Sequence, residues 1–149
     1  MLATHPTAKN QKQLIEKQID SESNYLKPIL TEYGIIIENN WNYLKELFEE
    51  IELIDYVIMP NHFHAIIGLG NSPRWKIKGT ATDLGNIIKA FKSKCTNDAK
   101  KLGFKDKRFW HKSYHEKIIR EQIDFQRIQK YIALNPYNWL AKFNPEQLA

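Results

Sequence analysis

The chain has 149 residues and a formal net charge of +5, from 22 Lys and Arg against 17 Asp and Glu. This length suits one domain that buries a core without staples, and the single cysteine, Cys95, excludes an internal disulfide. The polar first 23 residues do not resemble a signal peptide and no apolar run could cross a bilayer, so we expect a cytoplasmic protein without a membrane partner.

The amino-terminal third predicts an arm followed by a helix. Residues 1–25 are polar, show no core strand and are interpreted as a flexible arm, which leaves residues 26–149 as the domain. Tyr33 and Gly34 predict a turn into a short apolar segment. Apolar residues at helical spacing then predict an amphipathic helix over residues 40–52.

The middle of the chain predicts strands and a basic loop. Residues 54–59 are β-branched and aromatic, Pro60 and Asn61 interrupt them, and residues 62–69 resume a strand pattern. Two antiparallel strands around a turn and one strand bent at that point both fit this pattern. Residues 70–79 are rich in turn-forming and basic residues and predict a loop.

The carboxyl-terminal half predicts two more helices and a strand. One helix starts with Thr82 as its cap and ends at Gly103, an irregular segment follows, and a strand covers residues 114–119. The last helix spans residues 124–134, and the following Asn-Pro pair would end it. The order of elements predicts an α+β fold in which helices pack on an antiparallel sheet.

Basic residues gather in the second half of the chain. From Lys89 to Arg120 there are 11 basic residues against three acidic ones, with aromatic residues between them. Phosphate groups favour such charge, and bases stack on such rings. A solvated, lysine-rich helix face explains the composition equally well.

His62 and His64 are the first candidates for chemistry. Residues two apart on a strand point to the same face, so both imidazoles can bind one metal ion while Phe63 packs on the other face. Two ligands leave a metal site incomplete, and the pair alone also fits two surface histidines.

Tyr131 and Asn135 are the second pair of candidates. On a helix, residues four apart share one face and lie about 6 Å apart along the axis, so one side chain can attack while the other binds a metal ion. A tyrosine hydroxyl ordinarily has a pKa of about 10 and needs a nearby cation to act as a nucleophile. The alternative is that Tyr131 packs in the core and Asn135 caps the helix.

The motifs around these residues resemble one family in chain order. The segment MPNHFHAII resembles the HUH motif of single-tyrosine, IS200-like transposases, and YIALNP resembles the helix that carries their nucleophile. The segments LGNIIKAFKSK and RFWHKSYHEKIIR resemble those between the two motifs in the REP-associated tyrosine transposase branch. The resemblance extends over residues 33–139.

The resemblance implies a fold and a reaction. It implies the α+β fold of HUH endonucleases, which is of the ferredoxin-like type. His62, His64 and Asn135 would bind Mg or Mn, and Tyr131 would be the nucleophile. Such enzymes cut single-stranded DNA, often beside a hairpin, through a 5′-phosphotyrosine intermediate with a free 3′-OH that is later rejoined. Tyr114 is the alternative nucleophile.

The resemblance also directs attention to basic residues that would contact DNA. The expected contacts to the DNA backbone need only a positive charge at the surface. They are Lys89, Lys92, Lys94, Arg108, Lys112 and Arg120. For Arg120, an ion pair with Glu116 is the alternative role.

One departure from the family concerns its first strand. Family members normally begin with an aromatic and β-branched strand beside the HUH strand, and residues 1–25 contain no such pattern. Residues 25–37 would then join the sheet, a partner chain would complete it, or the sheet would lack its first strand. Relatives act as dimers or monomers, so a homodimer is one of the expected states.

Two other functions compete with the transposase. One is a truncated, catalytically inactive protein that still binds hairpin DNA. The other is a structural zinc site, which we disfavour because Cys95, His5, His111 and His115 are not spaced as a closed site.

Overall fold

The computed structural model describes residues 2–4, 14–20, 26–70 and 83–142 of the chain. The elements in these residues are β1 (Leu2–Thr4), β2 (Ile15–Ile19), β3 (Leu26–Leu30), α1 (Glu32–Leu47), β4 (Ile51–Met59), β5 (His62–Leu69), α2 (Leu84–Lys101), β6 (His115–Glu116) and α3 (Gln122–Ala141). Most of the predicted basic loop, residues 70–79, lies outside this description. No helix in the described ranges is long and apolar enough to cross a membrane.

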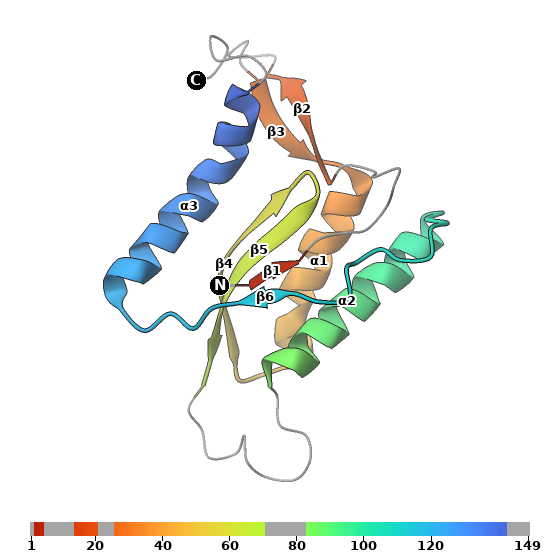
Figure 1. Ribbon diagram of the computed structural model, residues 1–149. Coiled ribbons are helices and arrows are strands. Elements are labelled where there is room, and N and C mark those ends of the chain that lie inside the picture. Colours follow the sequence, from red (N-terminus) through yellow and green to blue (C-terminus); the bar gives the residue numbers. More distant parts are fainter. Residues whose placement is uncertain (1, 5–13, 21–25, 71–82, 143–149) are drawn as a thin grey trace.

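The main sheet has four antiparallel strands in the order β4-β5-β1-β6 (Figure 1). Strands β4 and β5 pair along their whole length, and Met59 lies opposite His62 across the turn at Pro60 and Asn61. Of the two interpretations of this segment, two antiparallel strands around a turn is therefore the correct one.

Strand β1 occupies the place beside β5 where the sequence predicts no strand. Leu2 pairs with Ala65 on one side and with Glu116 of β6 on the other. The expectation that residues 1–25 contribute no strand is wrong for residues 2–4 and 15–19. Residues 1, 5–13 and 21–25 of the predicted arm lie outside the described residues. A three-residue strand between two neighbours is held by backbone hydrogen bonds and needs no β-branched or aromatic signature.

Of the segment 25–37, the described residues 26–37 do not join the main sheet. They contribute β3, which pairs with β2 in a separate two-stranded sheet, and the start of α1. Thr31 caps α1 by accepting a hydrogen bond from the Gly34 N–H at 3.3 Å, so the helix begins before the predicted turn rather than at residue 40.

The small sheet is anchored to the turn that precedes β5. The Leu14 N–H donates to the Pro60 carbonyl oxygen at 2.9 Å, and the Thr31 N–H donates to the Leu14 carbonyl oxygen at 3.0 Å. A Cβ on Gly34 would overlap that same Leu14 oxygen, so this close approach requires glycine. The turn that immediately precedes His62 is therefore held from outside the main sheet.

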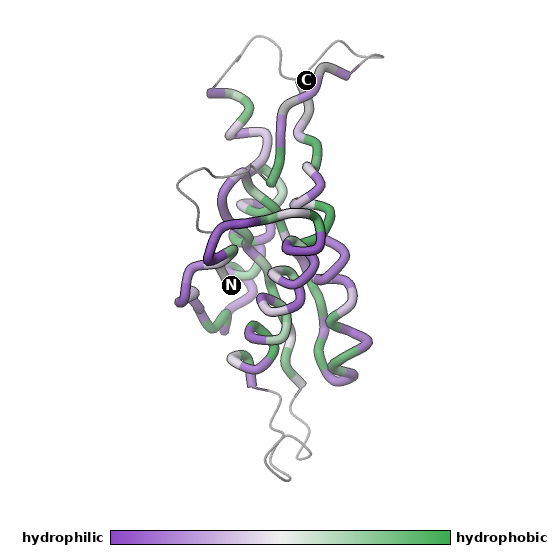
Figure 2. The backbone as a smooth tube through the Cα atoms, turned by 90° about the vertical axis from the view of Figure 1, so that its right-hand side faces the viewer, coloured by the Kyte–Doolittle hydropathy of each residue, from purple (hydrophilic) through white to green (hydrophobic). Residues whose placement is uncertain are grey.

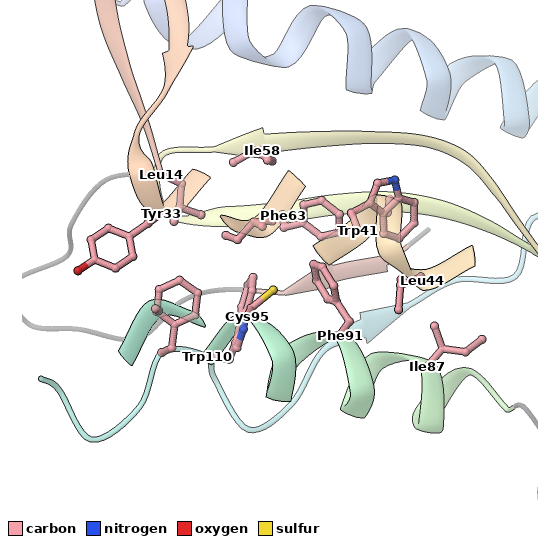
Figure 3. Close-up of a cluster of buried hydrophobic side chains, with 14 of the residues drawn as sticks. Leu14, Tyr33, Trp41, Leu44, Ile58, Phe63, Ile87, Phe91, Cys95 and Trp110 are labelled. Carbon is pink, nitrogen blue, oxygen red and sulfur yellow. The ribbon is translucent and has the colours of Figure 1, made fainter. Parts of the chain in front are cut away.

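The larger part of the core lies between the sheet and helices α1 and α2 (Figure 3). Phe63 of β5 packs against Trp41 and Phe91, with ring centroids 5.4 and 5.1 Å away. In Figure 2 the backbone alternates between hydrophobic and hydrophilic segments along the helices, as expected for helices with one buried side.

Helix α3 covers the opposite face of the sheet, over a smaller apolar cluster (Figure 1). The buried members of this cluster are Val57, Met59, Ile66 and Ile132. Partly buried apolar side chains pack around these four residues, namely Ile54, Ile119, Phe125, Ile128 and Trp139.

The predicted ends of the last two helices need correction. Asp83 caps α2 by accepting from the Asn86 N–H at 2.7 Å, whereas Thr82 lies outside the described residues. Helix α3 does not stop before Pro136 but continues to residue 141. An internal proline costs about 3 kcal/mol, and burial of Leu140 and most of Trp139 offsets it by roughly 2 kcal/mol or more for each side chain.

Candidate functional site

Strand β5 places its two histidines on the face covered by α3. His62 and His64 lie with ring centroids 4.8 Å apart and planes at 87°. Phe63 and Ala65, the alternate residues, are fully buried in the core on the other face. The alternation predicted from the sequence is confirmed, and the two imidazoles are neighbours.

Asn61, in the turn, fixes the orientation of the first histidine. Its Oδ1 lies 2.7 Å from Nδ1 of His62. When Nδ1 donates this hydrogen bond, the neutral ring keeps the lone pair on Nε2 for a metal ion. A hydrogen bond on the second ring nitrogen is the usual arrangement around metal-binding histidines.

Helix α3 brings Tyr131 to the same place. Its ring centroid lies 5.5 Å from that of His64, with the planes at 84°. Tyr131 is 46% exposed, whereas His64 is only 7% exposed. The hydroxyl-bearing side chain is thus accessible at the rim of the histidine pair, and the alternative that Tyr131 packs in the core does not hold.

Asn135 lies one turn after Tyr131 inside α3, so it does not cap this helix as the alternative interpretation supposed. Its Nδ2 atom is buried and has no hydrogen-bond partner among the described residues. A buried amide group ordinarily has a hydrogen-bond partner or a ligand. Rotation about the last torsion of the Asn135 side chain would exchange the nitrogen for the oxygen, an atom that can bind a metal ion.

A cleft of about 410 Å³ runs between the β4–β5 turn and α3. Its described lining is Met59, Pro60, Asn61, His62, Tyr131, Asn135, Asn138, Trp139 and Lys142. None of these residues is acidic, so the described walls of the cleft suit an anion.

Two residues of this wall, Asn138 and Lys142, were not predicted from the sequence. The prediction missed them because it ended the last helix at residue 134. Spacings of four, three and four residues from Tyr131 through Asn135 place them on one helical face, and this pattern would have identified them.

The donor set at this cleft fits a metal ion only with a neutral third ligand. Within the described ranges, no three His, Cys, Asp or Glu side chains gather into a metal site. A metal ion here would therefore use the imidazoles of His62 and His64 and the amide oxygen of Asn135. Uncharged ligands leave the full charge of the ion available to a phosphate.

The predicted basic residues on α2 lie on the other side of the sheet from α3 (Figure 1). The Lys92 ammonium donates to the carbonyl oxygens of His111 and Ser113 at 2.9 and 3.1 Å, and burial lowers its pKa. Lys94 lies 3.8 Å from the Asp98 carboxylate, and Lys89 is exposed. None of the three lines the cleft.

The other predicted residues are also outside the cleft. Arg108, Lys112 and Arg120 are exposed, and Arg120 borders a separate, mostly apolar cavity of about 560 Å³. Tyr114, the alternative nucleophile, lies under Lys92 of α2, with the ammonium 5.7 Å from its ring centroid. Of the two tyrosines, Tyr131 is therefore the one in ring contact with the histidine pair.

Comparison with known proteins places the chain in a family. The family of IS200-like transposases matches residues 7–135, and the chain belongs to this family. An uncharacterised protein of Haemophilus influenzae (strain Rd) is 29% identical over an alignment of 123 residues, and the match covers 74% of this chain and 68% of that protein.

A solved structure of a REP-associated tyrosine transposase bound to a REP hairpin has the same fold. It superposes with a TM-score of 0.63 at 18% identity, over 92% of this chain. This chain spans 65% of the length of that one. The predicted α+β fold and the predicted family are both confirmed.

Proposed function

We propose that this chain is a DNA transposase that nicks and rejoins single-stranded DNA, with Tyr131 as nucleophile and a DNA hairpin as the recognised element. The observation that carries the proposal is the ring contact between the accessible Tyr131 and His64, at 5.5 Å, beside a cleft whose described lining has no acidic residue. Family membership and the hairpin held by the structurally similar transposase support it.

The proposed reaction exchanges one phosphate ester for another. The Tyr131 oxygen attacks the scissile phosphorus and loses its proton, which forms a 5′-phosphotyrosine bond. The bond from phosphorus to the 3′ oxygen breaks, and that oxygen takes up a proton to leave as a 3′-OH. Attack by another 3′-OH reverses these steps, so rejoining the strands needs no external energy source.

His62, His64 and Asn135 are proposed to hold a divalent metal ion, Mg or Mn. When bound, the ion would polarise the scissile phosphate and stabilise the charge that develops on it. Asn61 would keep Nε2 of His62 available by holding Nδ1.

The basic residues outside the cleft are proposed to bind the backbone of the DNA hairpin. They are Lys89, Lys92, Lys94, Arg108, Lys112 and Arg120. Lys92 already uses two of its three N–H groups within the protein, so it would contribute less than the others. We propose that the reaction takes place in the cytoplasm, and a DNA substrate and a buried Cys95 without a disulfide support this proposal.

The test is covalent capture of labelled hairpin DNA with single-stranded flanks in the presence of Mn²⁺, followed by denaturing electrophoresis. Wild-type protein should give a covalent protein–DNA band. Tyr131→Phe should remove this band and leave hairpin retention on a native gel within about twofold, because only the attacking oxygen is lost. Tyr114→Phe is the matched control and should keep the band.

Loss of the band in Tyr114→Phe, with the band kept in Tyr131→Phe, would assign the nucleophile to the other tyrosine. Hairpin retention by the wild type without any covalent band would support the inactive DNA-binding protein instead. That alternative was based on a missing first strand, and β1 supplies a strand at this position.

A further inference from the structure

We infer that the cleft between the β4–β5 turn and α3 binds the single-stranded flank of the DNA, with Lys142 and Asn138 contacting a phosphate group other than the one that Tyr131 attacks. This inference rests on the proposed function, because it takes Tyr131 as the point of attack. It adds to the proposed function the route that the single strand takes along the protein from the phosphate that Tyr131 attacks.

Four polar side chains of α3 share one helical face. Tyr131, Asn135, Asn138 and Lys142 follow one another at spacings of four, three and four residues on α3, and all four line the same cleft. The facing wall is formed by the end of β4 at Met59, the turn at Pro60 and Asn61, and the start of β5 at His62. These four side chains therefore form one side of the cleft, starting at the proposed nucleophile.

Tyr131 and Lys142 lie far apart along the axis of α3. Eleven residues separate Tyr131 from Lys142, a rise of about 16 Å, whereas Asn135 is only about 6 Å along the axis from Tyr131. One phosphate group cannot reach both ends of this path. A strand that is cleaved at Tyr131 and contacts Lys142 must therefore lie along α3 for at least one further nucleotide.

The described lining of the cleft carries a positive charge at Lys142. Lys142 is exposed and is the only Lys or Arg in the described lining, which contains no Asp or Glu. Its backbone is held at the end of the helix, where its N–H donates to the Trp139 carbonyl oxygen at 3.3 Å. An ammonium group and a neighbouring amide can bind the phosphate of any nucleotide, whatever its base. Such contacts fit a flank that is bound without recognition of a specific base.

The experiment measures binding rather than cleavage. All proteins carry Tyr131→Phe, and the probes are labelled hairpins without a flank, with an oligothymidine flank on the 5′ side, or with one on the 3′ side. Adding Lys142→Gln should weaken binding of one flanked hairpin several-fold, reduce the slope of log K against log salt by about one, and leave the bare hairpin unchanged.

Lys130→Gln is the matched control, because Lys130 is an exposed lysine of α3 that does not line the cleft. It should leave all three affinities unchanged. Asn138→Ala should weaken binding of the same flanked hairpin as Lys142→Gln.

Equal affinities of the Lys142→Gln protein and its parent for both flanked hairpins would overturn the inference, and so would an equal loss on the bare hairpin. These outcomes are separate from the covalent band of wild-type protein. If Lys142→Gln weakens binding of a flanked hairpin only, but the wild type gives no covalent band, the inferred route of the flank stands and the proposed reaction is contradicted.

Discussion

On the α1–α2 face of the main sheet, Phe63 is fully buried among aromatic rings, whereas on the α3 face its neighbours His62 and His64 lie beside a polar cleft. The same strand builds both faces because successive residues point to opposite sides. The large core cluster lies on the first face, and only a small cluster around Ile132 closes the second. Stability can therefore come mainly from one face while the other carries the proposed chemistry.

In the described part of the chain, Asn40 on one face and His64 on the other are buried polar residues, and the two are held differently. On the α1–α2 face, the Asn40 amide donates to the Ile36 carbonyl oxygen at 2.9 Å and to the Asp98 carboxylate at 3.0 Å. On the α3 face, His64 lies against the ring of Tyr131. The first arrangement joins two helices, and the second joins a strand to the proposed nucleophile.

The largest expected effect on stability is at the core face. Phe63→Ala should lower the free energy of unfolding by about 3–5 kcal/mol, because it removes a buried ring and leaves a cavity. Denaturation by urea, with the midpoint and slope fitted together, measures this change. Leu134→Ala on α3 is the control, since that side chain is exposed, and should change stability by less than about 0.5 kcal/mol. Equal losses for both would contradict the proposed division between the faces.

A smaller effect is expected from the charge that holds α1 to α2. The hydrogen bond from Asn40 lowers the pKa of Asp98, which Lys94 and Lys101 also lower. A folded pKa below the unfolded value adds stability above the unfolded pKa, and this stability is lost as the pH falls through the folded pKa. Asp98→Asn should therefore cost less than about 1 kcal/mol at pH 7, because the group is partly exposed.

The pH dependence separates this charge effect from a packing effect. Unfolding curves of wild type and Asp98→Asn should converge as the pH is lowered toward the acid range in which the wild-type carboxyl is protonated. A difference that stays constant over the whole range would show that packing, and not the charge, is responsible.

The parts of the structure that the sequence predicted are those with a local pattern. The alternation of His62, Phe63 and His64 sets the two faces of β5, and the spacing of Tyr131 and Asn135 sets one face of a helix. Both patterns depend only on the period of the secondary structure, so they are visible without the fold.

The parts that were missed depend on contacts between distant segments. Helix α3 passes Pro136 because Leu140 is buried against the rest of the molecule, and β1 forms because two strands flank it. The start of α1 depends on the contact between Gly34 and Leu14. The charge pattern likewise gave no indication that the lysines of α2 lie on the face away from α3.

The most direct test of the account is Mn²⁺ binding by calorimetry, together with thermal unfolding, for wild type and the double variant His62→Ala/His64→Ala. Wild type should bind Mn²⁺, and the double variant should not bind it but should still unfold cooperatively, because the main core lies on the other face. An unfolded double variant, or a wild type that does not bind Mn²⁺, would contradict a metal site that is separate from the structural core.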